Sequence, residues 1–392
     1  MGLVNIAVGP QHPALKEPIN FSFQTDGERI VSADARIGYA HRGIEKGMEQ
    51  NNYVQGLFLT ERICGICSHA HSMSYVMAVE EAMKIEPPKR AQYIRCIVGE
   101  LERLHSHLLW IGVAAHEVGF DTVFMYSWKD REVVMDILER LSGNRVNYAI
   151  NIFGGVKRDI DAEQAKDILK KIEKLEKRLQ YYIDIGEHEP SFVARFKDVG
   201  VLTSEQASSL GAVGPTARGS GVTVDHRKDD IFAIYHEIDF TVCIEQAGDA
   251  LARYIVRARE LVESCKIIRQ LLEKMPEGEI KVKHPRKAGP AEVVARYEAP
   301  RGEDVHYLWA DGSDKPFRYK VRAPTLAAIP ATLEMFKNAH VADIPVIIAS
   351  IDPCISCTDR AIALTDSRTG STMSWKELRD FSNRWYADRS RR

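Results

Sequence analysis

The stretch PPKRAQYIRCIVGELERLHSHLLWI, Pro87 to Ile111, sets the fold class of this chain. Two prolines at its start are typical of the first turn of a helix, where a missing backbone N–H costs nothing. Apolar residues then recur at steps of three and four, at Ile94, Ile97, Val98, Leu101, Leu104, Leu108 and Ile111. This spacing places them on one face, so it predicts a long helix that packs against a core.

The same periodicity extends from about Gly56 to about Leu272, broken by loops such as GGVKRDID and VGPTARGSG. In one charge-rich part of this region apolar residues alternate with Lys and Glu, which predicts a solvated outer helix rather than a binding arm. Its apolar residues are Ile168, Ile172, Leu175, Leu179 and Ile183. Most of the chain is therefore expected to be helical.

Two shorter regions predict β-structure. The segment NFSFQTDGERIV, Asn20 to Val31, alternates apolar and polar residues around Asp-Gly and predicts a hairpin. A second β element is expected between Ile280 and Arg322, where Gly, Pro and β-branched residues gather. The expected fold class is α+β and predominantly α-helical, with a central helical bundle and small β elements near the N-terminus and in the C-terminal half.

Composition excludes several classes of protein. With 392 residues, 45% hydrophobic content and a formal net charge of −2, the chain can bury a large core but lacks the basic footprint of a nucleic-acid binder. Its longest uncharged apolar run, IPVIIASI from Ile344 to Ile351, is far shorter than the roughly 20 residues that cross a bilayer. We therefore expect no membrane-spanning helix and no nucleic-acid partner.

The seven cysteines form an odd set that favours metal ligands or free thiols over a disulfide framework. Two Cys-x-x-Cys pairs stand out, in ERICGICSHAHS (Glu61 to Ser72) and IDPCISCTDR (Ile351 to Arg360). A structural zinc site normally draws its ligands from a short module, and a redox pair needs only one such motif beside a βαβ unit. Four thiolates are soft ligands that suit late transition metals or an iron-sulfur cluster. The single cysteines, Cys96, Cys243 and Cys265, lie in helical patterns and are expected in the core.

Residues beside the two pairs extend the site. If the segment after Cys67 is helical, His71 lies on the same face as that sulfur, where an imidazole can support a metal ligand. His69 falls on another face and is expected to be a surface histidine. Asp352, two residues before Cys354, could accept a hydrogen bond or hold a loop turn.

These motifs resemble the two signatures of nickel-iron hydrogenase large subunits, and EAPRGEDVHYLW (Glu298 to Trp309) resembles a third element of that family. The stretches GPQHPA, HRGIEKGME, ELERLHSHLLWIG and GNRVNYAINIFGGV are similar to the group 4 branch, which is membrane-bound, energy-converting and related to the quinone-site subunit of respiratory complex I. The resemblance covers most of residues 8 to 360.

The resemblance implies a nickel-iron centre whose iron carries CO and cyanide. All four cysteines of the pairs would bind nickel, with Cys64 and Cys354 as terminal ligands, and Cys67 and Cys357 would also bind iron. Such a centre cleaves H2 heterolytically, or runs the same reaction backwards.

It also implies roles for residues outside the pairs. Arg301 matches a guanidinium suspended over the metals, and Glu17 matches a carboxylate that relays protons from the terminal cysteine. Glu45 matches a position that binds magnesium in other branches, but Arg360 stands where those branches have the completing histidine. His12 is expected to anchor its loop.

The expected function is thus the catalytic large subunit of an energy-converting nickel-iron hydrogenase. A complex I-like quinone or sulfur-reducing relative is the first alternative, and a structural metal-binding scaffold is the second. The branch implies an iron-sulfur small subunit, membrane ion-translocating subunits and a ferredoxin-type electron carrier as partners, at the cytoplasmic side of the cell membrane.

A single domain is expected over residues 1–360, with an N-terminal part (1–55), the bundle (56–275) and a β-containing part (276–360). The 32 residues after Arg360 (392 − 360) resemble the maturation peptide that a protease removes from many hydrogenase precursors; the alternative is a retained hairpin and helix.

Overall fold

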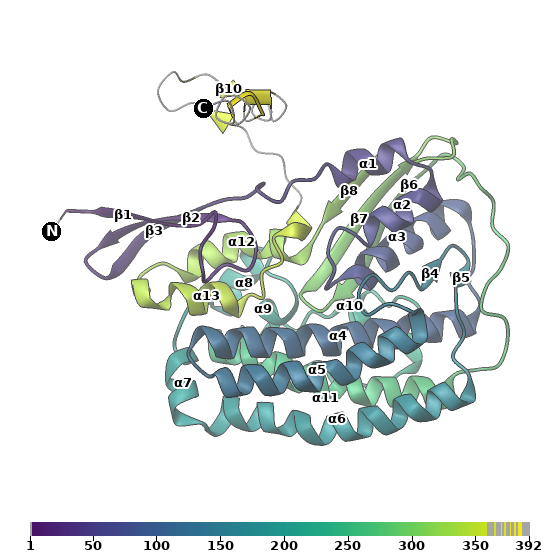
Figure 1. Ribbon diagram of the computed structural model, residues 1–392, viewed down its shortest axis with the longest axis horizontal. Helices are drawn as coiled ribbons and strands as arrows, with labels where there is room; N and C mark the ends of the chain where they lie inside the picture. Colours follow the sequence, from purple (N-terminus) through teal and green to yellow (C-terminus); the bar gives the residue numbers. More distant parts are fainter. Residues whose placement is uncertain are drawn as a thin grey trace.

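A bundle of long helices fills the lower half of the molecule in Figure 1. The computed structural model describes residues 2–358, together with 364, 365, 370, 372, 373, 377, 380, 381 and 383–385. The bundle contains α4 (Lys89–Glu117), α5 (Asp121–Ser142), α6 (Ala162–His188) and α11 (Ala250–Lys274). Helices α4 and α6 each lie against both α5 and α11. The long helix predicted after Pro87 is confirmed.

The helix ends follow from local side chains. Asp161 and Gln164 form a capping box that starts α6, and the Asp249 side chain accepts a hydrogen bond from Ala252 N at the start of α11. Gly143, with φ of 88°, ends α5 in the left-handed conformation that favours glycine. Helix α6 buries the apolar residues predicted for it and exposes its charged face, which confirms the outer helix.

A three-stranded antiparallel sheet lies above the bundle and packs against α3 (Ser68–Met83). Its strands are β6 (Ala291–Ala299), β7 (Gly302–Ala310) and β8 (Arg318–Arg322). The β6–β7 hairpin turns on Pro300 and Arg301, and Ala299 pairs with Gly302. A Cβ atom on Gly302 would lie 2.6 Å from the backbone N of Gly214, so the hairpin tip requires glycine there. The second predicted β element is confirmed.

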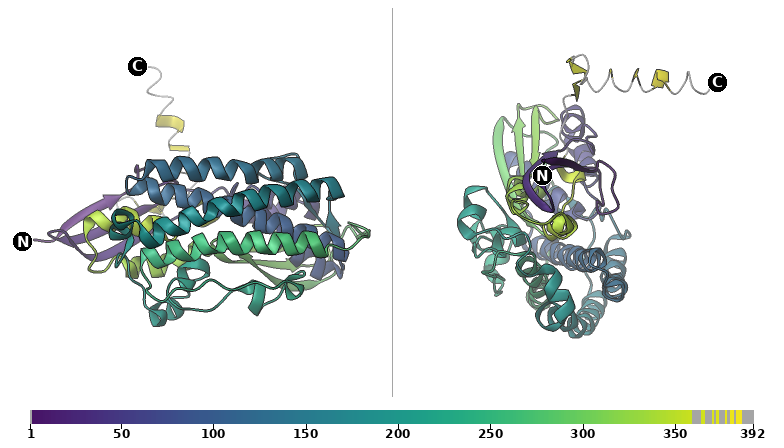
Figure 2. Two further views of the ribbon diagram at one scale, coloured as in Figure 1. Left: turned by 90° about the horizontal axis from the view of Figure 1, so that it is seen from below. Right: turned by 90° about the vertical axis from the view of Figure 1, so that its left-hand side faces the viewer.

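A second antiparallel sheet forms one end of the molecule, as Figure 2 shows. Its order is β1 (Val4–Val8), β2 (Asn20–Asp26) and β3 (Arg29–Arg36), which confirms the predicted hairpin and adds β1. Phe21, Phe23 and Ile30 from this sheet pack with Phe336 and Ile348 in a separate apolar cluster. That cluster joins the sheet to α12 (Pro324–Met335) and α13 (Ile344–Ser350).

The remaining elements are short. They are α1 (Ile44–Gln50), α2 (Tyr53–Thr60), β4 (Asn151–Ile152), β5 (Gly155–Val156), α7 (Pro190–Phe196), α8 (Ser204–Ser209), α9 (Gly214–Arg218), α10 (His226–Asp229), η1 (Tyr235–Glu237), η2 (Val341–Asp343), η3 (Ser356–Thr358), β9 (Leu364–Thr365) and β10 (Thr372–Met373). The architecture is α+β and predominantly helical, as predicted.

Two local expectations were wrong. The segment VGPTARGSG was expected to be a loop, but it contains the short helix α9 because Pro215 occupies the first turn of a helix. Cys243 was expected to lie in a helix and pack in the core, but it is half-buried in a segment without regular secondary structure. Cys96 and Cys265 are buried as predicted.

No helix in the described parts of the chain is long and apolar enough to cross a membrane. The division into a single domain and an extension stays a prediction, and the cleavage position after Arg360 lies outside the described residues.

Candidate metal centre

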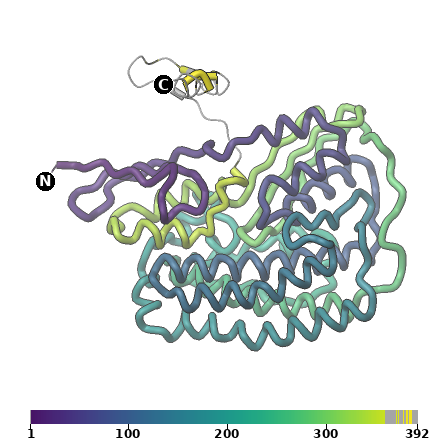
Figure 3. The backbone as a smooth tube through the Cα atoms, in the orientation of Figure 1, coloured from purple at the N-terminus to yellow at the C-terminus, as the bar shows by residue number. Residues whose placement is uncertain are grey.

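The two Cys-x-x-Cys pairs meet where the ends of the chain come together above the bundle. Cys64 lies in the turn between α2 and α3, and Cys67 is the residue that caps α3. Cys354 follows α13, and Cys357 lies in η3. Figure 3 shows the N-terminal loop in purple beside the C-terminal segment in yellow-green at this point. All four thiols are buried, with at most 4% of each residue exposed.

The sulfur atoms form a tight cluster without a disulfide. Cys354 Sγ lies 3.2 Å from Cys64 Sγ and 2.7 Å from Cys357 Sγ. These distances exceed the roughly 2.05 Å of a disulfide bond, and all four cysteines are free. Hydrogen bonds from Cys354 and the other thiols hold the pKa of Cys64 well below its usual value, whereas burial raises the pKa of Cys357. The thiols of Cys64, Cys354 and Cys357 therefore lie close enough together to hold one metal ion, and the thiol of Cys67 contacts those of Cys64 and Cys357.

Arg301 reaches this cluster from the tip of the β6–β7 hairpin. Its Nη1 donates to Cys67 Sγ and to Ser106 Oγ, both at 3.1 Å. Asp352 holds the other side, because its carbonyl oxygen accepts from Nε at 2.8 Å and its Oδ1 accepts from Nη2 at 2.7 Å. Burial opposes the charge, but Asp352 and the nearby thiols raise the pKa of Arg301 well above its usual value. A fixed positive charge thus lies against one sulfur.

Asp352 can make both contacts because of its backbone. Its φ is 54°, in the left-handed region that Asp tolerates better than most residues, and its N–H bonds to Ala349 O at 2.9 Å. This turn points its carbonyl group and its carboxylate at the same guanidinium. Asp352 has both of the roles considered for it: it accepts hydrogen bonds, and it shapes the turn before Cys354.

A buried network of charges fixes the hairpin tip. Arg103 on α4 donates to the backbone oxygens of Glu298 and Ala299, at 2.7 and 3.3 Å. The Glu298 carboxylate in turn accepts from Arg218 Nη1 at 2.9 Å. Because these groups are fully buried and paired, the strand that leads to Arg301 is held rigidly against the bundle.

Glu17 approaches the cluster from the loop between β1 and β2. Its Oε2 accepts hydrogen bonds from the backbone N–H groups of Ile355 and Ser356, the latter at 3.0 Å. These residues directly follow Cys354. Its hydrogen bond with Cys357 lowers its pKa, but the hydrogen bond with Cys64, burial and, to a smaller extent, the Glu17 charge together raise that pKa well above its usual value. The carboxylate expected from the sequence therefore lies beside Cys354.

His71 contacts a different sulfur from the one expected. The sequence pattern related it to Cys67, one helical turn away, but its Nε2 lies 3.4 Å from Cys357 Sγ. Its other ring nitrogen, Nδ1, lies 3.1 Å from His306 Nε2 and 3.3 Å from Asp304 Oδ2. The imidazole thus joins the second Cys-x-x-Cys loop to strand β7.

The expectation that His69 is a surface histidine was wrong. Only 1% of it is exposed, because α3 is covered on nearly every side and its ring packs edge-on against Tyr297. His12 accepts a hydrogen bond from Ala14 N at 3.2 Å, as expected of a residue that anchors its loop.

Glu45 does not fit a magnesium site. Its carboxylate accepts from Lys320 Nζ at 2.5 Å and from Val321 N at 3.0 Å, so its charge is already balanced. It belongs to no cluster of three possible metal ligands within the described residues, and Arg360 lies outside them.

Two residues that support the cluster were missed by the sequence reasoning. Arg42 donates to the carbonyl oxygens of Arg62, Ile63 and Ser356 at 2.7, 2.6 and 3.1 Å, and so ties the two cysteine loops together. Glu102 is fully buried and accepts from His69 N and Ala70 N at the start of α3. Arg42 lies within HRGIEKGME, one of the stretches that resemble the family. For Glu102, the only sequence signal was the presence of a glutamate inside the apolar pattern of α4.

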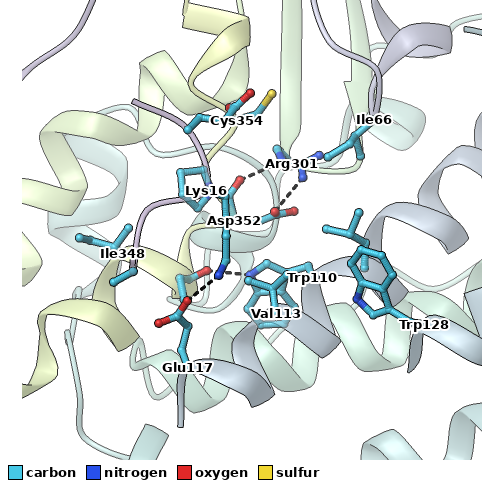
Figure 4. Close-up of a pocket in the computed structure, with 15 residues that line it drawn as sticks. Lys16, Ile66, Trp110, Val113, Glu117, Trp128, Arg301, Ile348, Asp352 and Cys354 are labelled. Atoms are coloured by element: carbon cyan, nitrogen blue, oxygen red, sulfur yellow. Dashed lines mark hydrogen bonds and ion pairs between the residues drawn. The ribbon is translucent and has the colours of Figure 1, made fainter. Parts of the chain in front are cut away.

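An apolar cavity of about 370 Å³ opens beside the cluster, as shown in Figure 4. Cys354, Arg301, Asp352 and Glu17 line its inner side. Its outer side is lined by Trp110, Val113, Trp128, Ile348 and the ion pair between Lys16 Nζ and Glu117 Oε1, which are 2.9 Å apart. Small molecules could therefore reach the sulfur atoms through a space that is mostly dry.

Comparison with known proteins agrees with this geometry. The model of a family described as nickel-dependent hydrogenase matches residues 42–127, and the model described as respiratory-chain NADH dehydrogenase, 49 Kd subunit, matches residues 117–293 and 287–360. The chain is 45% identical to the membrane-bound hydrogenase subunit alpha of Pyrococcus furiosus, over 93% of this chain and 89% of that protein. The chain belongs to the group 4 hydrogenase family.

The chain is also similar to proteins that are not named as hydrogenases. One subunit of the F420H2 dehydrogenase of Methanosarcina mazei is 39% identical over 91% of this chain and 97% of its own length. A solved chain from a membrane-bound sulfane sulfur reductase, an archaeal respiratory membrane complex, superposes with a TM-score of 0.87 at 34% identity, covering 91% of this chain and 98% of its own. Membership therefore establishes an oxidoreductase family of membrane complexes, and the reaction has to be argued from the site.

Proposed function

We propose that this chain is the catalytic large subunit of an energy-converting nickel-iron hydrogenase, which interconverts H2 with protons and electrons. The observation that carries the proposal is that four buried free thiols from two distant segments gather here, and that three of them, in Cys64, Cys354 and Cys357, lie close enough together to hold one metal ion. An enzyme that reduces a quinone does not need a set of four thiol ligands for a metal. A large helical core also makes a purely structural metal unnecessary.

The residues present fit a nickel-iron group. Thiolates are the soft donors that nickel and low-valent iron accept, and the site offers four of them in a dry setting. Cys64, Cys67, Cys354 and Cys357 would hold nickel, and Cys67 and Cys357 would also hold iron, whose other ligands would be CO and cyanide. When bound, this group supplies heterolytic cleavage of H2.

The protein's own groups would orient the substrate and move the proton. Arg301, clamped by Asp352, presents a fixed charge at the inner end of the apolar cavity, where it can orient H2 and stabilise developing charge. Glu17, anchored on the N–H groups beside Cys354, would take a proton from that sulfur and pass it along the N-terminal loop.

Partner subunits would complete the enzyme. The full sequence has no cysteine run of the ferredoxin type, so electrons would leave through an iron-sulfur small subunit to a ferredoxin-type carrier. Relatives named as membrane-bound support ion-translocating partners and a peripheral position at the cytoplasmic side of the membrane.

Reduction of sulfur or of a quinone is the second candidate. The similarity to a sulfane sulfur reductase favours it, and the cavity of about 370 Å³ is far larger than H2 requires. The four-thiol set weighs against it.

Activity measurements on the purified complex separate the two candidates. We expect H2 production from a reduced electron donor, and we expect Cys357→Ser to abolish it. Cys265→Ser is the matched control, because Cys265 is equally buried but lies in the middle of α11. Sulfide formation from polysulfide without H2 production, or full activity of Cys357→Ser, would contradict the proposal.

A further inference from the structure

A chain of hydrogen bonds leads from Cys357 into strands β7 and β8. Cys357 Sγ lies 3.4 Å from His71 Nε2, His71 Nδ1 lies 3.1 Å from His306 Nε2, and His306 Nδ1 lies 2.5 Å from the Tyr319 hydroxyl. All four residues are buried, with no more than 4% of any exposed. Three side chains thus follow one another behind a single sulfur of the cluster.

The two imidazoles face each other end to end. Their ring centroids are 5.4 Å apart and their planes differ by 24°. The facing nitrogens account for 3.1 Å of that distance, and the remaining 2.3 Å (5.4 − 3.1) is taken up by the two ring radii. The nitrogens therefore lie almost on the line between the rings, which is the geometry of an N–H···N hydrogen bond.

This alignment excludes a metal ion shared by His71, His306 and Asp304, although their ligand atoms are close together. Metal–nitrogen bonds are about 2.0–2.1 Å long and follow the lone pairs. An ion bound to both nitrogens would have to lie to the side of the line that joins them, away from both lone pairs. The cluster is a hydrogen-bond network.

Only one proton can lie between the two rings. Two N–H groups facing each other across 3.1 Å would bring their hydrogens to within about 1 Å, since each N–H bond is itself about 1 Å long. Asp304 Oδ2 lies 3.1 Å from His306 Nε2 and accepts from Ser74 Oγ at 2.9 Å. The same oxygen also lies 3.3 Å from His71 Nδ1, so its charge alone does not choose between the rings. The choice comes from the Tyr319 hydroxyl, because a hydroxyl that donates to His306 Nδ1 leaves the His306 proton on Nε2. His71 then accepts at Nδ1 and keeps its own proton on Nε2, the atom that faces Cys357.

The chain ends inside the protein. Tyr319 is wholly buried and packs edge-on against Tyr75, with ring centroids 5.5 Å apart. A proton route to solvent would need an exposed end, so these groups orient His71 rather than conduct protons.

We propose that Tyr319, His306 and Asp304 are positioning residues that aim the Nε2–H of His71 at the Cys357 sulfur, and so set the hydrogen bonding of one thiolate in the proposed metal centre. The link to metal chemistry rests on the proposed function, but the proton order of the chain does not. Buried polar chains of this kind are cooperative, so removing one end changes groups two links away.

Selective 15N labelling of histidine in the metal-free, full-length chain tests the proposal. Tyr319→Phe removes one hydroxyl, and we expect it to change the ring-nitrogen signals of both His306 and His71. Tyr75→Phe is the matched control, because the Tyr75 hydroxyl donates to Tyr53 O at 3.0 Å and lies outside the chain. An unchanged His71 signal in Tyr319→Phe, or an equal change in Tyr75→Phe, would overturn the proposal.

Infrared spectra of the metal-loaded complex provide the second arm. We expect Tyr319→Phe to shift the CO and cyanide bands, and Tyr75→Phe to leave them in place. If the band positions in Tyr319→Phe equal those of the wild type, the proposal that this chain affects the Cys357 thiolate is wrong. If wild-type protein shows no such bands, the hydrogenase assignment fails, and the labelled histidines still decide the proton order.

Discussion

Replacing Arg42 with alanine should loosen the contact between the two cysteine loops. The guanidinium donates to two carbonyl oxygens of the first loop and one of the second, at 2.6 to 3.1 Å. A net value of about 0.5–1.5 kcal/mol for each hydrogen bond gives about 1.5–4.5 kcal/mol. Because Arg42 is exposed to solvent, we take the lower part of this range, about 2 kcal/mol. Separated loops should then be about 30-fold more populated than in the wild type.

Hydrogen exchange followed by mass spectrometry measures this population in the metal-free chain. Peptides that cover residues 61–67 and 352–358 should exchange about 30-fold faster in Arg42→Ala, while peptides from α6 should be unchanged. The control is Arg62→Ala, which keeps the carbonyl oxygen that Arg42 contacts and removes an exposed side chain whose hydrogen bonds, within the described residues, go to Phe58 O and Glu61. Equal exchange in the two variants would refute the idea that Arg42 ties the loops together.

Three further predictions concern single carboxylates. Glu17→Gln keeps an oxygen for the backbone N–H groups but cannot accept a proton, so H2 production should fall by about 10²- to 10⁴-fold at unchanged nickel content; an unchanged rate would contradict its role. Asp352→Ala leaves the Arg301 charge buried without its carboxylate partner and should cost about 3–5 kcal/mol of stability, which a shift of the urea midpoint measures; no shift would show that the pair is not needed. Burial raises the pKa of Glu61 to about 7, so between about pH 4.5 and 7 the folded chain holds a proton that the unfolded chain has lost. The free energy of unfolding should therefore fall as the pH rises through this range, by up to about 3 kcal/mol. In Glu61→Gln the urea midpoint should change less with pH than it does in the wild type.

The helical architecture was predictable because its signal is local. The three- and four-residue spacing along Pro87 to Ile111 and the charged face of α6 each specify a helix without knowledge of its neighbours. The Asp-Gly turn and the Pro/Gly-rich stretch before β6 are likewise local signals, and they predicted the positions of the two sheets. Strand β1 was missed, because it depends on pairing with β2 rather than on its own pattern.

The site was predictable only as far as motifs extend. The cysteines, Arg301 and Glu17 were found because a family resemblance joined segments hundreds of residues apart, and the structure brings them together. His69 was misjudged because α3 is covered on nearly every side, so helical position alone does not reveal its exposure. The contacts of His71 with Cys357 and His306 span 286 and 235 positions, and no local pattern encodes them.

Metal analysis joined to infrared spectroscopy of the purified complex is the decisive test of the proposed nickel-iron site. We predict nickel and iron bound to the large subunit, with infrared bands from CO and cyanide that are lost in Cys357→Ser and retained in Cys265→Ser. Zinc alone, or no metal together with full activity toward sulfur or a quinone, would contradict the proposed site.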